Sequence, residues 1–176
     1  MNKRAKQLVL ACSVPVLILL GMCFSPLYTM LTGEDMILQT KPLDPSDLFR
    51  GDYVTLQYEA EEVPISLVDK AVVSRLQDQG GQFDVFVLME KKDGVHTPIK
   101  VSLEKPDKGI FLKGTINYID KDNQGQEIAF IEYNLDKYFL EDNTGTEWEN
   151  ASAKGEILAK LKVNNGYAVL TDITTK

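Results

Sequence analysis

The chain has 176 residues, of which 44% are hydrophobic and 26% are charged, as is normal for a folded protein. Its formal net charge of −7 is unevenly placed, because Lys3, Arg4 and Lys6 precede a long apolar run and the first acid is Glu34. Residues 32–176 therefore hold 16 basic against 26 acidic side chains, in a segment long enough for one ordinary domain. Phosphates would be repelled by so acidic a domain, so we expect no nucleic-acid partner.

The apolar run at residues 8–31 predicts a transmembrane anchor. It has 24 residues without a charge, which span about 36 Å as a helix and can cross a hydrocarbon core of about 30 Å. Pro15 is expected to kink this helix, and Pro26 to lie near its exit. The resulting organisation is a short cytoplasmic N-terminus at 1–7, the lipid-embedded anchor, and an extracytoplasmic domain at 32–176.

The sequence offers poor support for two alternatives to a retained anchor, a cleaved signal peptide and a lipoprotein. A cleaved signal peptide needs small residues after the apolar core, and residues 22–28 offer no such site. A lipoprotein would use Cys23, but the bulky Met22 precedes it where a small residue is expected. A retained anchor is favoured, and the basic residues before it place the N-terminus in the cytoplasm.

The domain begins with strand signals. Residues 35–40 can form a strand, and two prolines at positions 42 and 45 then favour extended or turn geometry. Residues 52–58 alternate in polarity and predict a further strand. A helix is predicted at 66–78 from apolar residues at helical spacing, and Gly80-Gly81 follows it as a stop signal.

The helix start is predicted from Ser66 followed by Asp69, which resembles a capping box. The rest of the chain reads as strands, with strong turn signals at Lys92-Asp93-Gly94 and Asn164-Asn165-Gly166. The predicted fold is mainly β, at the margin of α+β: an antiparallel sandwich or barrel-like domain with one short helix near 66–78. The remaining predicted strands are 83–90, 95–104, 110–119, 126–135, 156–163 and 167–173.

Metal and catalytic signals are weak. The two cysteines, Cys12 and Cys23, both lie in the apolar run, so the domain has neither a disulfide nor a thiol nucleophile. A lone histidine, His96, is more typical of a structural role than of catalysis, and a zinc site built from His and Cys is excluded by the number of these residues. Residues 120–125 begin like a calcium loop, but position 12 is Ile131 instead of an acid, which favours a polar hairpin loop. No metal and no cofactor are predicted.

The most specific feature is the segment Gly51-Asp52-Tyr53-Val54-Thr55-Leu56-Gln57-Tyr58, which matches the pattern G-D-Y-x-x-L-x-Y at every defined position. The chain therefore resembles the membrane-anchored GDYXXLXY family. Residues 42–45, 47–50, 113–115 and 138–145 resemble further family segments. Asp142 and Asn143 depart from the family pattern, in which a glutamate and a glycine are usual.

The resemblance implies a bacterial exported domain whose function is uncharacterised. Members are often encoded beside a polytopic membrane protein, which suggests such a protein as a partner. We therefore expect an accessory or binding subunit of an integral membrane protein or envelope system, and no enzyme.

The motif itself allows a structural or a binding role. Gly51 permits a sharp bend, and Asp52 could accept backbone N–H groups or pair with Arg50, so the motif could simply fix a corner of the fold. Tyr53 and Tyr58 fall on opposite faces of the strand, and we expect one of them in the core. The candidate groove or corner comprises Arg50, Gly51, Asp52, Tyr53, Leu56, Tyr58 and Tyr138.

An alternative function is a hydrolase or peptidase relic with signal-peptidase-like β architecture. That chemistry needs a nucleophile beside a base, and Ser46 lies in Asp44-Pro45-Ser46-Asp47, which does not resemble the serine motif of that class. A third reading, a purely structural envelope protein, would leave no pocket near Asp52 and Tyr138.

Overall fold

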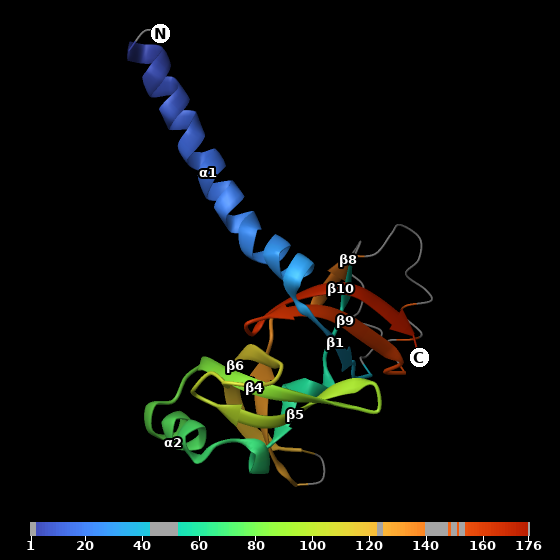
Figure 1. Cartoon of the computed structure of the whole chain (residues 1–176). Coiled ribbons are helices and arrows are strands. Elements are labelled where there is room, and N and C mark those ends of the chain that lie inside the picture. Colours follow the sequence, from blue (N-terminus) through green and yellow to red (C-terminus); the bar gives the residue numbers. More distant parts are fainter. Residues whose placement is uncertain are drawn as a thin grey trace.

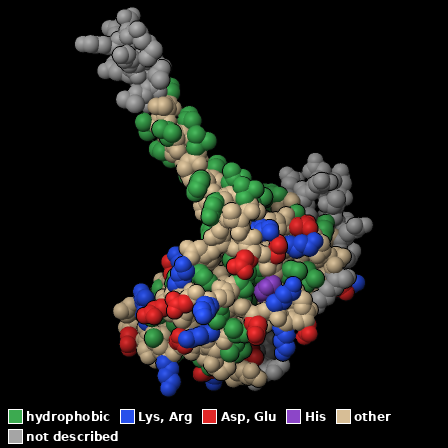
Figure 2. Space-filling view, in the orientation of Figure 1, with side chains coloured by type: hydrophobic (Ala, Val, Ile, Leu, Met, Phe, Trp, Pro, Cys, Tyr) green, Lys and Arg blue, Asp and Glu red, His purple; other side chains and the backbone are tan. Residues whose placement is uncertain are grey.

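The computed structural model describes residues 3–42, 53–122, 125–139, 148, 151 and 154–175, with side chains from residue 11 onward. A long helix, α1, stands off a β-rich domain (Figure 1). From residue 11 onward its apolar side chains are uncovered, and the domain carries many charged side chains on the face shown (Figure 2).

Helix α1 (Lys3–Thr32) runs through both Pro15 and Pro26 without ending. Within the described residues it is the helix long and apolar enough to cross a membrane, over the window Ala11–Thr32. Its large side chains are exposed, as shown by Leu20 at 63% and Leu31 at 77%. The predicted N-terminal apolar helix is therefore present.

A single residue, Gly33, separates α1 from the first strand. Its N–H donates to the Thr29 carbonyl at 2.8 Å, and Thr29 is only 2% exposed. A Cβ at Gly33 would lie 2.5 Å from that carbonyl oxygen and 3.0 Å from the Val163 backbone nitrogen. The Asn164 Nδ2 group donates to Thr32 Oγ1 at 2.9 Å. The last turn of the helix is thus packed into the domain.

The helix contacts a three-stranded antiparallel sheet of order β1-β9-β10, made of β1 (Glu34–Gln39), β9 (Ile157–Asn164) and β10 (Tyr167–Thr175). Asn165 and Gly166 form a two-residue turn with φ of 54° and 84°, the left-handed geometry that favours Asn-Gly in hairpins. The turn predicted here from the sequence is confirmed, and its tip lies beside the lower end of α1 (Figure 1).

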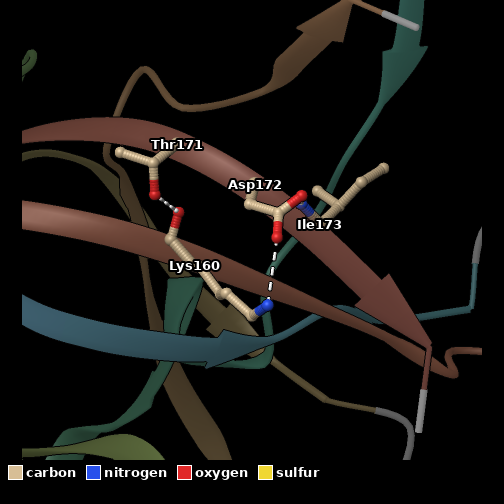
Figure 3. Close-up of polar contacts among 4 residues, drawn as sticks. All are labelled: Lys160, Thr171, Asp172 and Ile173. Atoms are coloured by element: carbon tan, nitrogen blue, oxygen red, sulfur yellow. Dashed lines mark hydrogen bonds and ion pairs between the residues drawn. The ribbon is translucent and has the colours of Figure 1, made fainter.

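A bulge between Leu170 and Asp172 shifts the β9–β10 register. Polar contacts close around it: Lys160 Nζ pairs with Asp172 Oδ2 at 3.0 Å, and Thr171 Oγ1 donates to the Lys160 carbonyl at 3.0 Å (Figure 3). The other Asp172 oxygen accepts the N–H of Ile173 at 2.9 Å. These bonds are made at the point where the regular β9–β10 register is interrupted.

The larger sheet is also antiparallel, with the order β3-β7-β6-β4-β5, and a two-stranded ribbon pairs β2 with β8. The mainly β, antiparallel fold class predicted from the sequence is confirmed. The three-residue strands β3 and β8 were not predicted, because so short a segment carries no readable alternation. The strands are β2 (Tyr53–Thr55), β3 (Glu62–Pro64), β4 (Phe83–Lys92), β5 (Val95–Ser102), β6 (Phe111–Lys121), β7 (Glu127–Glu132) and β8 (Lys137–Phe139).

The second helix, α2 (Lys70–Gln79), begins later than predicted. Residues Ile65–Leu67 form a separate 3₁₀ turn, so the capping box predicted from Ser66 is wrong. Asp69 is the N-cap, but its carboxylate pairs with Lys100 at 3.1 Å instead of capping the helix. An ion pair to the neighbouring strand has replaced the local cap. The helix ends at Gln79, one residue beyond the predicted end, and Gly80 follows it as the predicted stop signal.

One hydrophobic core joins the sheets, and His96 adds a polar link between them. His96 lies on β5 and is 6% exposed, and its Nδ1 accepts the backbone N–H of Ile37 on β1 at 3.1 Å. The same nitrogen also lies 3.3 Å from the Ile37 carbonyl oxygen, so His96 contacts both backbone polar groups of Ile37. The largest fully buried side chains of the core are Tyr58, Met36, Leu38, Leu56, Leu112, Ile116, Ile131, Ile157, Leu161, Val54 and Val63.

We predict that acidification weakens the fold through His96. Burial is the largest cause that lowers the pKa of His96 below its ordinary value; the contact with Ile37 acts in the opposite direction, and the nearby Lys91 lowers the pKa further. The unfolded chain then binds the proton more readily, so this contribution to stability is full above about pH 6.5 and is lost as the pH falls below it. The check is urea unfolding of the full chain in detergent micelles at pH 7.5 and 5.5, followed by circular dichroism. The variant His96→Asn keeps an acceptor for Ile37 but cannot titrate, so it should lose less stability; an equal loss in both proteins would contradict the prediction.

Candidate functional site

The motif strand β2 pairs with β8, which includes the first residues of the family segment at 138–145, although the two strands are far apart in the chain. In the β2–β8 ribbon, Tyr53 lies opposite Phe139 and Val54 lies opposite Tyr138. Since side chains alternate along a strand, Tyr53 and Tyr138 belong to opposite faces of this ribbon. Of the candidate residues, Arg50, Gly51 and Asp52 lie outside the described residues.

The outer face of the ribbon carries an aromatic pair. The rings of Tyr53 and Phe139 meet edge to face with centroids 5.9 Å apart, and Lys137 Nζ lies 5.7 Å from the Tyr53 ring. Phe139 is 73% exposed, whereas Tyr53 is half-buried. Such a surface combines apolar area with a positive charge.

The inner side of the motif is anchored in the core. Val54, Leu56 and Tyr58 are buried to 0–1% exposure, as the alternation predicted, although the regular strand covers only Tyr53–Thr55. The Tyr58 hydroxyl donates to the Leu135 carbonyl at 2.7 Å, and the Leu56 N–H donates to the Asp136 carbonyl at 2.8 Å. Leu56 and Tyr58 therefore hold the motif against the segment that precedes β8.

A second buried tyrosine repeats this arrangement in the reverse direction. The Tyr133 hydroxyl donates to the Ala60 carbonyl at 2.8 Å, and Tyr133 is 6% exposed. Tyr58 and Tyr133 thus join the same two segments, each binding the backbone of the other. No sequence pattern pointed to Tyr133 as part of the site, because it lies outside every recognised motif.

We predict that the two motif tyrosines differ in their contribution to stability. Tyr58→Phe leaves the buried Leu135 carbonyl without its partner and should cost about 1–3 kcal/mol in the free energy of unfolding. Tyr53→Phe is the matched control, because its hydroxyl makes no hydrogen bond within the described part of the chain, and it should change stability by less than about 0.5 kcal/mol. Urea unfolding of the full chain measures both. Equal effects of the two substitutions would show that the Tyr58 hydrogen bond does not hold the motif in place.

A cleft of about 320 Å³ opens beside the motif, and we call it the motif cleft. Its walls are Thr55, Leu56 and Gln57 of the motif, together with strands β6 and β7. A β-bulge between Ile116 and Tyr118 shifts the β6–β7 register, so that Tyr118 pairs with Phe130 and their ring centroids lie 4.5 Å apart. Three carboxylates complete the lining: Glu61, Glu132 and Asp136.

Glu61 has the most perturbed carboxyl group of the cleft. Its pKa is raised to about 7, chiefly by burial, and the nearby Glu132 and Asp136 act in the same direction. The Tyr58 N–H, 3.0 Å from Glu61 Oε2, and Lys41 act in the opposite direction. The Glu61 carboxyl therefore titrates near neutral pH. The acidic lining favours a positively charged group over an anion.

The acids of the motif cleft are not arranged as a metal site. Among the described residues, no three His, Cys, Asp or Glu side chains are placed to hold a metal ion together. The Asn117 Nδ2 group donates to Glu132 Oε2 at 3.5 Å. Ser46, on which the peptidase alternative depends, lies outside the described residues. The arrangement is suited to noncovalent recognition of a cation.

The fold and its site define a mainly β domain joined to an apolar N-terminal helix. The sequence profile described as GDYXXLXY protein matches residues 15–173, so the chain belongs to the GDYXXLXY protein family. The function of that family is unknown. No curated protein and no solved structure matches the chain.

Proposed function

We propose that the chain is a membrane-anchored binding subunit and not an enzyme. In this proposal α1 stays in the bilayer, the N-terminus is cytoplasmic, and the domain works outside the cytoplasm beside an integral membrane protein or an envelope ligand. The lipid contact is made by residues 8–31, and the partner of greatest interest is a polytopic membrane protein.

The observation that carries the proposal is the way α1 joins the domain. Thr29 is buried by the domain, and Thr32 accepts a hydrogen bond from Asn164. Gly33, whose N–H donates to the Thr29 carbonyl, is the single residue between α1 and β1. A signal sequence that is removed need not pack into the mature fold. Removing α1 here would take away contacts of β9 and β10, which supports a retained helix.

Orientation follows from charge. Lys3, Arg4 and Lys6 precede the apolar run, and basic residues next to a membrane span are typical of its cytoplasmic side. The acidic domain follows on the other side of the span.

A binding role is supported by the motif cleft and by the positions of the histidine and the two cysteines. His96 already accepts a hydrogen bond from Ile37, and Cys12 and Cys23 both lie in α1. The cleft offers carboxylates and the exposed ring of Tyr118, which suit a lysine or arginine side chain of a partner.

The test is position-specific photo-crosslinking of the full chain in its native membrane. A photoreactive residue at Gln57, exposed at the rim of the motif cleft, should form a discrete adduct with a membrane protein. The matched control is Lys92, which is also exposed but lies at the end of the β4–β5 hairpin. The mass of the recovered chain should include residues 1–32.

Two results would contradict the proposal. A mature chain lacking α1 would show that the helix is a removed signal. Adducts of equal yield at Gln57 and Lys92 would show that the motif cleft does not select a partner.

A further inference from the structure

A second pocket, which we call the juxtamembrane pocket, lies where the two sheets meet near the end of α1. It has a volume of about 330 Å³ and is closed on one side by the β9–β10 hairpin tip, at Asn165, Gly166 and Tyr167. The opposite side is the start of β6, including Lys113, Gly114 and Thr115. The Lys113 N–H donates to the Gly166 carbonyl at 2.9 Å and ties the two sides together.

The pocket is small and its shape is constrained. Gly114 lies on its β6 side, and a Cβ there would come 2.7 Å from Ile131 Cγ2 and 3.0 Å from the Glu132 carbonyl oxygen. The close approach of β6 to β7 therefore requires glycine at this position. A volume near the lower end of the range for ligand pockets fits a compact polar group.

The rim carries one positive and one negative charge. Lys113 Nζ lies 2.6 Å from Asp84 Oδ2, and the two side chains are 52% and 60% exposed. Both residues line the pocket, as do Asn134 and Asn165. Neither asparagine amide makes a hydrogen bond to another residue of the described chain. The pocket thus offers a cation, an anion and amide groups, with no net charge.

The position of the pocket relative to the proposed anchor indicates which class of ligand it would meet. Asn164 bonds Thr32 at the end of α1, and Asn165, the next residue, lines the pocket. The Cα atoms of these two neighbouring residues are about 3.8 Å apart. This distance is shorter than the depth of the headgroup layer, which is about 5–7 Å on each side of the hydrocarbon core. A pocket that starts at the hairpin tip therefore lies close to the level of lipid headgroups. Figure 1 shows this tip beside the lower end of α1.

We propose that the juxtamembrane pocket binds the phosphoethanolamine headgroup of a bilayer lipid. Lys113 would pair with the phosphate, and Asp84 would accept hydrogen bonds from the primary ammonium group. An anionic headgroup is disfavoured because the domain is acidic and the rim is neutral. A choline headgroup has no N–H to donate to Asp84. This inference rests on the proposed membrane anchor.

The test is native mass spectrometry of the full chain released from micelles that contain equal amounts of phosphatidylethanolamine, phosphatidylcholine and phosphatidylglycerol. Wild type should retain phosphatidylethanolamine in preference to the other two. Asp84→Asn and Lys113→Met should each lower this retention by about tenfold, as expected when one charge-assisted hydrogen bond is lost.

The matched control is Lys100→Met, which removes the cation of another exposed ion pair, Asp69–Lys100, away from the hairpin tip. This variant should retain the lipid as wild type does. The urea unfolding midpoint of each variant, measured on the same samples, separates loss of lipid from loss of fold.

Three results would overturn the proposal: equal retention of the three lipids by wild type, full retention by both pocket variants, or an affinity for free phosphoethanolamine equal to that for the lipid. The last result would assign the pocket to a soluble ligand. Because the measurement needs neither a protein partner nor a defined topology, its outcome is independent of the crosslinking that tests the proposed function.

Discussion

The attachment of α1 to the β9–β10 hairpin is the constraint on which the rest of the arrangement depends. Helix and sheet approach closely at Gly33, because a side chain there would collide with the Thr29 carbonyl and the Val163 backbone. The buried Thr29 and the Thr32–Asn164 hydrogen bond fix the direction in which the helix leaves. The orientation of every strand relative to the proposed bilayer follows from this junction.

Within the domain, the family motif has a structural task that also creates a surface. Its inner side chains, including Tyr58, hold the motif against the segment before β8, and Tyr133 returns the same type of bond to Ala60. The two segments therefore meet at a fixed separation beside the β6 bulge. The motif cleft lies between them, with Glu61 and Asp136 on its walls. The structural and binding readings of the motif are thus compatible.

The features that could be predicted from the sequence are those set by residues close together in the chain. The uncharged run at 8–31, the Asn-Gly turn and the alternation at Tyr53–Tyr58 each depend on neighbouring residues alone. The predicted start of α2 was wrong because Asp69 pairs with Lys100. This contact forms only when β5 lies beside the helix start. The acids of the motif cleft were not predicted as a group, because Glu61 and Asp136 come from distant parts of the chain. The pocket at the hairpin tip likewise exists only through the packing of two sheets.

The central claim, that helix and domain form one unit, is tested most directly by pulsed electron paramagnetic resonance on the full chain in lipid nanodiscs. One spin label occupies the native Cys23, with Cys12→Ser to avoid a second site, and the other occupies Lys92→Cys at the end of the β4–β5 hairpin. The junction predicts a single narrow distance distribution, which broadens when a Gly-Gly-Ser insertion follows Gly33. A broad distribution in the uninterrupted chain, equal to that of the insertion variant, would contradict the account.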